Sequence, residues 1–486
     1  MNNASNEAGS GIRQGQAPFG WAQIARLGLV QASLGAVVVL TTSTLNRVMV
    51  VELALPALLP GILVALHYIV QMARPRMGFG SDVGGRRTPW ILGGMAVLAC
   101  GGVLAAAATA WMAVNPAGGI ALAFIAFMLI GLGVSASGTS LLVMLAKRVE
   151  ESRRAAAATV VWVMMIAGFA ITSGVAGQLL DPYSPARLIA VTAGVCMLAM
   201  VVSLLAVWRL EGPAAGARPA QVPEAKPRFT DALRQVWGEP VARRFTVFVF
   251  VSMLAYSAQD LILEPFAGTV FGFTPGQSTS LSGVQHGGVL LGMIMAAVAG
   301  SAGARFGWHR AGSLRAWTIG GCIVSALALL GLVAAGIAGP GWPLRTTVFV
   351  LGAANGAFSI GAIGSMMRLA GEGRQAREGV RMGLWGAAQA IAFGLGGLLG
   401  TAASDLARWL ISSPGAAYAS VFGFEALMFL VSALLAWRIG TPASPARSAP
   451  VRAAAKEAMP AAASAGPAIM KFPPAGDAYV ARMEHR

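Results

Sequence analysis

Charge is scarce in this sequence. Its 486 residues include 35 basic and 19 acidic side chains, which together make up 11%, whereas about a quarter of the residues of a soluble globular protein are charged. Residues 88–146 and 265–304 carry no charged side chain. Each stretch is longer than the ~20 apolar residues that a helix needs to cross a bilayer. The shortage excludes a water-soluble enzyme as the default and indicates a membrane protein with several crossings.

Cysteine and histidine are scarce as well, with three and four copies. Cys100, Cys196 and Cys322 lie far apart inside apolar runs, which excludes a disulfide framework and the spacing of metal ligands. The sequence has no P-loop, no hydrolase elbow and no aspartate-rich pair of the prenyltransferase kind. We therefore expect a protein that is not an enzyme, with no catalytic residues, no bound metal ion and no nucleotide.

Apolar runs are what the sequence has in abundance, since 56% of its residues are hydrophobic. The runs between charge clusters predict twelve membrane-spanning helices, with eleven or thirteen as alternatives around residues 260–285. The expected helices cover residues 27–46, 56–74, 90–112, 118–146, 156–180, 187–208, 244–263, 282–303, 314–338, 345–369, 382–404 and 417–437.

The basic residues are distributed unevenly between the two sides of this arrangement. With the N-terminus inside, 31 of the 35 fall on the cytoplasmic side, and only Arg47, Arg187, Arg345 and Arg408 fall outside. This asymmetry follows the positive-inside rule. It predicts a multi-pass inner-membrane protein with both termini in the cytoplasm. The net charge of +16 then reflects topology in the lipid bilayer, and no nucleic acid partner is expected.

A segment rich in proline, alanine and charge divides the chain into two six-helix halves. The predicted parts are a cytoplasmic N-terminal segment, an N-terminal half, a cytoplasmic linker, a C-terminal half and a disordered cytoplasmic tail, at residues 1–26, 27–209, 210–243, 244–439 and 440–486. The halves echo one another, because a glycine spacing after the second helix returns 222 residues later from Gly300 to His309, with Ala304 in place of an aspartate. Parallel repeats of this kind build six-plus-six transporter folds.

The first copy of this spacing is a candidate conformational loop. It consists of Gly78, Asp82, Gly85, Arg86 and Arg87. The loop resembles the signature of the major facilitator superfamily between its second and third helices. That resemblance implies an all-α polytopic fold of twelve transmembrane helices, in which the aspartate caps the third helix or pairs with an arginine. The simpler interpretation is that the two arginines are only positive-inside anchors.

Polar side chains within and at the non-cytoplasmic ends of the predicted helices form a candidate cavity or gate cluster. They are expected at the ends of the first and seventh helices and in the middle of the twelfth, at Asn46, Arg47, Glu52, Gln259, Asp260, Glu264 and Glu425. Unpaired charge near hydrocarbon costs a few kcal/mol, so Arg47 should pair with a carboxylate. The cluster is either a gate or proton-linked site, or a structural ion pair that joins the two halves. Glu425 is protonated, paired with a polar neighbour, or functional.

Two histidines lie within predicted helices that are equivalent by the repeat, His67 and His286. Their depths differ, so a symmetric metal pair is not expected. A neutral imidazole is a good nitrogen ligand for the magnesium of a chlorin ring. The simpler alternative is a packed, hydrogen-bonded histidine, and both interpretations stay open for each residue.

Several stretches resemble one family, the PucC and LhaA proteins of phototrophic bacteria. These stretches are Thr44–Leu53, Arg74–Asp82, Gly85–Pro89, Ala258–Gly268, Gly383–Gln389 and Val421–Glu425. The resemblance implies an assembly factor for light-harvesting complexes that binds or delivers bacteriochlorophyll. It also implies antenna polypeptides, bacteriochlorophyll synthase and the protein-insertion machinery as partners.

The residues themselves leave other functions open. A secondary transporter of a pigment, lipid or other amphipathic molecule would need two conformers of different affinity and a titrating carboxylate, with Asp260, Glu264 and Glu425 as candidates. A subunit of a pigment-synthesis enzyme is disfavoured, because a catalytic constellation is missing.

Overall fold

The computed structural model describes residues 18–74, 86–211, 234, 237–306, 313–371 and 378–439, and every regular element within these ranges is a helix. The first half contains α1 (Trp21–Val39), α2 (Leu45–Arg47), α3 (Leu58–Val70), α5 (Thr88–Met112), α6 (Pro116–Arg148), α7 (Arg154–Leu180) and α8 (Pro185–Val207). The second half contains α10 (Pro240–Phe271), α11 (Pro275–Phe306), α12 (Leu314–Ala338), α13 (Leu344–Gly371), α14 (Glu378–Leu410) and α15 (Pro414–Ile439). The predicted all-helical class is confirmed.

Eleven helical spans in the described residues are long and apolar enough to cross a membrane. The predicted second helix is shorter, because α3 has 13 residues and continues only as a 3-10 turn over Gln71–Ala73. Each of the twelve predicted segments contains one of these helices. The alternative of a further helix near residues 260–285 is wrong, because α10 and α11 are separated there by only the three residues 272–274.

The first span runs from Trp21 to Glu52, six residues past its predicted end at residue 46. Two π-helical turns interrupt it, η1 (Leu40–Thr44) and η2 (Val48–Glu52), on either side of α2. In the first of these turns the hydroxyl of Thr41 donates to the Val38 carbonyl at 2.8 Å. Such turns widen a helix locally and occur often at functional sites. They place the polar residues of this segment inside the span and not beyond its end.

The seventh helix also continues past its predicted end. Proline was expected to close it at residue 263, but α10 includes Pro265 and ends at Phe271. Proline is tolerated within membrane helices, because neighbouring helices and side chains satisfy the freed backbone groups. The helix ends instead at Gly272, whose φ of 68° is readily adopted by glycine. Gln259, Asp260 and Glu264 therefore lie well inside the span.

Close helix contacts at glycine hold each half together. A Cβ added at Gly292 of α11 would lie 1.9 Å from the Ala353 carbonyl oxygen of α13. In the first half, a Cβ at Gly133 of α6 would lie 2.5 Å from the Leu98 amide nitrogen of α5. Without an attraction between apolar helices, membrane bundles rely on such close packing. Each half has its own buried apolar cluster.

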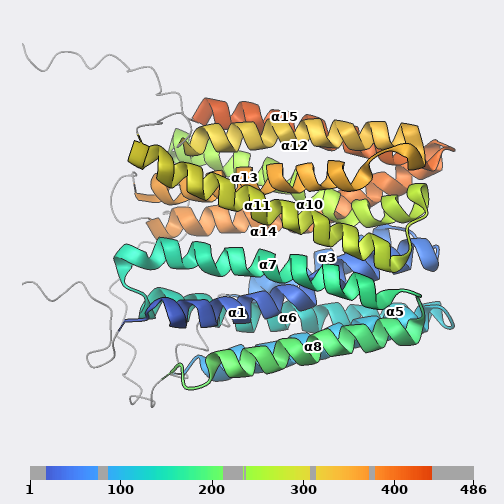
Figure 1. The fold of residues 1–486 in the computed structure, drawn as a ribbon, viewed down its shortest axis with the longest axis horizontal. Coiled ribbons are helices and arrows are strands. Elements are labelled where there is room, and N and C mark those ends of the chain that lie inside the picture. Colours follow the sequence, from blue (N-terminus) through green and yellow to red (C-terminus); the bar gives the residue numbers. More distant parts are fainter. Residues whose placement is uncertain are drawn as a thin grey trace, which may run out of the picture. The chain divides into compact units, whose positions relative to one another are not determined.

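The two halves meet along two helix pairs, α7 with α11 and α3 with α14. Figure 1 shows α1, α3, α5, α6, α7 and α8 grouped together and α10 to α15 grouped beside them, with α7 next to α11. A third apolar cluster joins the halves, with Ile166 of α7 packed among Val289 and Met293 of α11.

Half-buried carboxylates hold both ends of the predicted linker. Glu211 accepts hydrogen bonds from the backbone N–H groups of Arg87 and Thr88 at 2.7–2.9 Å and so caps α5. Glu239, directly before α10, receives two hydrogen bonds from Arg381 of α14 at its Oε2 and one at its Oε1, at 2.8–3.1 Å. The sequence suggested Asp82 either for the cap of α5 or for an ion pair with an arginine, and Asp82 lies outside the described residues.

The candidate conformational loop is described only at its end. Gly78, Asp82 and Gly85 lie outside the described residues, as do Gly307 and His309 of the second copy. Arg86 is exposed and Arg87 is buried. The linker beyond Glu211 and the predicted tail also lie outside the described residues, apart from isolated positions before α10.

Candidate functional site

Side chains in and just after the first π turn of the first span form a row of hydrogen bonds to the second half. They join hydroxyl and amide side chains of the first span to α10 and α11: Thr44 Oγ1 to Thr279 Oγ1 at 3.0 Å, Ser43 Oγ to Ser282 Oγ at 3.3 Å, and Asn46 Nδ2 to the Leu261 carbonyl at 2.6 Å. All of these side chains are buried. The row therefore fixes the spacing between helix one and the second half.

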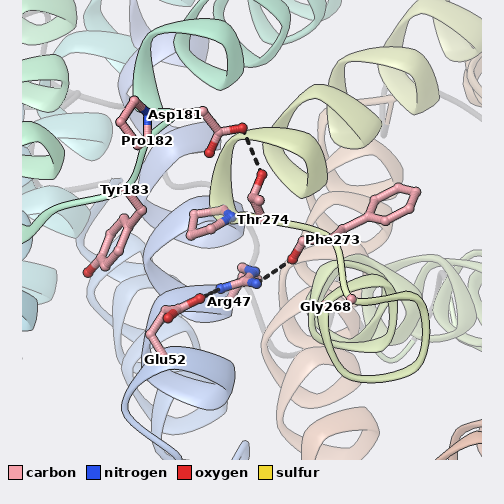
Figure 2. A pocket seen from close by; sticks show the side chains of 10 residues that line it. Arg47, Glu52, Asp181, Pro182, Tyr183, Gly268, Phe273 and Thr274 are labelled. Atoms are coloured by element: carbon pink, nitrogen blue, oxygen red, sulfur yellow. Dashed lines mark hydrogen bonds and ion pairs between the residues drawn. The ribbon is translucent and has the colours of Figure 1, made fainter.

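Arg47 is the buried charge of this seam. Its guanidinium, 2% exposed, pairs with Glu52 through Nη1 and donates from Nη2 to the Phe273 carbonyl at 2.6 Å (Figure 2). The prediction that Arg47 pairs with a carboxylate is confirmed, and Glu52 is the partner. The link to the second half runs through a backbone carbonyl. Gly268 allows this approach, because a Cβ there would lie 3.1 Å from the guanidinium nitrogens.

A cavity of about 590 Å³ lies beside Arg47. It is at the end of the helix bundle that carries loops 53–57, 181–184 and 272–274, and this end is called here the Asp181 end. It is lined by charged and aromatic side chains and by backbone from both halves, namely Arg47, Glu52, Asp181, Pro182, Tyr183, Gly268, Gly272, Phe273, Thr274 and Pro275. Burial raises the pKa of the Tyr183 phenol, and the negative charge of Glu52 raises it further while Arg47 opposes both. The cavity is thus lined by charged, aromatic and backbone groups together.

Two aspartates tie the halves together at the Asp181 end, and sequence reasoning missed both. Asp181 accepts from Thr274 Oγ1 at 2.7 Å and from the Gly276 amide at 3.2 Å (Figure 2). Asp405 of α14 accepts from the backbone amides of Ala57 and Leu58 at 3.0 and 2.8 Å, and so caps α3 from the other half. Asp181 directly follows α7, a position that could have indicated a cap, whereas Asp405 lies inside α14 and carries no such signal.

Asp260 lies deeper, where an aromatic group joins α3 to the second half. Its Oδ1 accepts from Gln285 Nε2 at 3.2 Å. Tyr68 packs on Phe393 with ring centroids 5.6 Å apart, and Tyr256 packs on the same ring at 5.9 Å. Asp260, which the sequence named, thus gains in Gln285 a partner that it did not name. Asp260 is half-buried, whereas the glutamine is buried.

The other members of the predicted polar cluster do not join one group. Glu264 is 2% exposed and lies near Ser43 and Arg47 of the first span. Its carboxyl oxygens make no hydrogen bond among the described residues. Gln259 and Glu425 are likewise buried with unpaired polar atoms in this part of the chain. The single predicted cluster is therefore three environments: the Arg47 seam, the Asp260 group and isolated carboxyl or amide groups within the second half.

The histidines are buried in different surroundings. His67 Nε2 contacts Gln71 Nε2 at 2.7 Å, one turn further along the chain. His286 Nδ1 contacts the Ser282 carbonyl at 2.8 Å, and its ring packs edge-on against Phe169 of α7 with centroids 5.0 Å apart. The described residues contain no group of three or more histidine, cysteine or acidic side chains that could hold a metal ion.

Solved structures with the same arrangement are transporters of the major facilitator superfamily. A D-xylose-proton symporter aligns with a TM-score of 0.65 at 15% identity, over 86% of this chain and 97% of the other. A mutant of the peptide transporter POT aligns at 0.63 and 16%, over 87% and 97%. At these identities the likeness establishes the fold alone, and the predicted major facilitator fold is confirmed.

Sequence relatives cover almost the same region. A protein of Rhodobacter capsulatus called the bacteriochlorophyll synthase 44.5 kDa chain is 54% identical over 418 residues, which is 86% of this chain and 95% of the relative. The protein PucC of Cereibacter sphaeroides is 31% identical over 442 residues, 83% of this chain and 89% of the relative. A family model described as PUCC protein matches residues 44–443. The chain therefore belongs to the PUCC protein family.

Proposed function

We propose that this protein is a non-enzymatic membrane factor that binds bacteriochlorophyll and supplies it while antenna polypeptides are inserted. The observation that carries the proposal is the 54% identity to a relative whose name places it in bacteriochlorophyll metabolism, over 95% of that relative's length. A transporter-type fold supports a binding role over catalysis, since such folds place a ligand between two halves.

The interior of the bundle suits an apolar, planar ligand. Aromatic rings of both halves meet at Tyr68 and Phe393 and again at Phe169 and His286. The polar groups among them are few and specific, as in small-molecule sites generally. A chlorin ring with a long hydrocarbon tail is the pigment that matches such a surface.

The partners proposed from the family are antenna polypeptides, bacteriochlorophyll synthase and the protein-insertion machinery. The proposed location is the inner membrane, with both termini in the cytoplasm. The excess of basic residues in the segments predicted to be cytoplasmic supports this orientation. It places the Asp181 end at the periplasmic face.

Deletion of the gene tests the proposal. We expect assembled antenna complexes to fall, while bacteriochlorophyll synthase activity in isolated membranes stays at the parental level. Re-expression of the wild-type chain should restore the antenna, which controls for effects on neighbouring genes. Unchanged antenna absorption in the deletion strain would contradict a role in assembly.

Secondary transport of an amphipathic molecule is the second candidate. It is favoured by two carboxyl groups on α10 next to the seam between the halves, the half-buried Asp260 and the buried Glu264. A transporter moves its ligand across the membrane, whereas an assembly factor need only hold it. Uptake of pigment into sealed vesicles that depends on a proton gradient, and that is lost in Asp260→Asn, would favour transport.

A further inference from the structure

The two buried histidines differ in which ring nitrogen keeps a lone pair. Arg74 donates to Gln71 Oε1, so the Gln71 amide must present its NH₂ group to His67. The lone pair of His67 Nε2 is therefore already used, and the proton is on Nδ1. That Nδ1 is fully enclosed and has no hydrogen-bond partner among the described residues. His67 has no nitrogen ready for a ligand.

His286 has the opposite arrangement. Its Nδ1 lies 2.8 Å from the Ser282 carbonyl oxygen, which can only accept, so Nδ1 must carry the proton. In the neutral ring this leaves the lone pair on Nε2. The described residues form no hydrogen bond to Nε2, and the residue is 7% exposed. A histidine that donates one N–H to a backbone carbonyl and keeps a lone pair on the other nitrogen has the usual form of a metal-ligating imidazole.

We propose that His286 Nε2 is the axial ligand to the magnesium of a chlorin bound at the seam between the halves. This inference rests on the proposed function, because it presumes that the protein binds bacteriochlorophyll. The magnesium of a chlorin is held by the ring nitrogens and accepts one further ligand, so a single imidazole suffices and no cluster of protein ligands is needed.

The surroundings of His286 suit an apolar macrocycle. Phe169 of α7 packs edge-on against the imidazole, and Ile166, Val289 and Leu290 line the same seam. Ser282 is itself held by Ser43 of the first span at 3.3 Å. Both halves therefore contribute to the site.

The test compares full-length variants purified in mild detergent from a pigment-producing host. The measurements are bacteriochlorophyll bound per protein and the resonance Raman bands that report the coordination number of magnesium. We expect His286→Ala to lower bound pigment at least about tenfold, in the range found when metal-site residues are removed. His67→Ala is the matched control and should keep both readouts, because its lone pair is already occupied.

A chemical rescue separates loss of the ligand from loss of the fold. His286→Gly with added imidazole should regain pigment and the five-coordinate signature. Unchanged pigment and spectra in His286→Ala, or equal loss in His67→Ala, would overturn the assignment. Wild-type protein without pigment would instead contradict the binding role in the proposed function. Pigment bound independently of His286 would contradict this inference alone.

Discussion

Arg47→Ala is expected to loosen the Asp181 end without unfolding either half. The substitution removes a guanidinium that is 2% exposed and leaves the Phe273 carbonyl without its donor. A hydrogen bond from a charged donor contributes about 1.5–3 kcal/mol. The ion pair adds little to this, because Glu52 is 34% exposed and its charge is screened by solvent. We therefore expect the contact between the two halves at the Asp181 end to weaken by about 2 kcal/mol. The fraction of molecules in which this end is open should rise roughly 30-fold.

Cysteine labelling measures that population. Thr279, 1% exposed, faces Thr44 across the seam. In a chain without its three native cysteines, Thr279→Cys should react with a maleimide only when the end opens. The labelling rate should then rise about 30-fold in Arg47→Ala, following the open population.

The control is an arginine that makes no such contact. Arg345 was predicted to lie on the same side of the membrane and is exposed in the structure. Arg345→Ala should leave the labelling rate within about threefold of the parent, since exposed substitutions have small effects. An Arg47→Ala rate equal to that of the control, with the melting temperature in detergent unchanged, would refute the reasoning.

Three further substitutions test other contacts. Gly292→Leu should lower the melting temperature in detergent strongly, because a Cβ would meet the Ala353 carbonyl, whereas Gly287→Ala, which meets no atom within 4 Å, should not. Asp405→Asn should raise labelling of Thr279→Cys by roughly three- to tenfold, through a weaker cap on α3; labelling at the parental rate would exclude that role. The raised pKa of Tyr183 means that its folded form retains the proton above pH 10. Stability should therefore decline between pH 10 and that pKa, and Tyr183→Phe should abolish this decline, as followed by thermal melts.

The architecture could be predicted because membrane helices depend on simple composition. Each of the twelve predicted segments contains a helix, since unpaired backbone groups are too costly in hydrocarbon for other structures to persist. Helix ends were less predictable. The seventh helix is predicted to end at residue 263, yet a membrane helix accommodates Pro265 and continues to Phe271. The first helix is predicted to end at residue 46, yet it continues past Arg47 through a π turn to Glu52.

The candidate site could be predicted only in part. Arg47 was correctly expected to find a carboxylate, because an unpaired charge at this depth is costly. Its contact with the Phe273 carbonyl depends on α10 continuing to Phe271, eight residues past the end predicted at residue 263, before Gly272 caps it. Asp181 and Asp405 were missed because each caps a helix of the other half, and such pairings arise from tertiary packing.

The histidines illustrate the same limit. The internal repeat places His67 and His286 in corresponding helices at different depths, and the sequence leaves the same two interpretations open for each. The structure separates them through hydrogen bonds to Gln71 in one case and to a backbone carbonyl in the other. Which nitrogen carries the proton follows from local geometry, and residue identity alone does not determine it.

The two carboxylates that flank the linker have a consequence for how the chain can be divided. Glu211 is held by the start of α5 in the first half, and Glu239 is held by Arg381 in the second. Neither anchor needs the covalent connection between them. The two halves should therefore behave as separately encodable fragments: a chain cut between residues 212 and 233 keeps both attachments, and the fragments expressed together should find one another in the membrane.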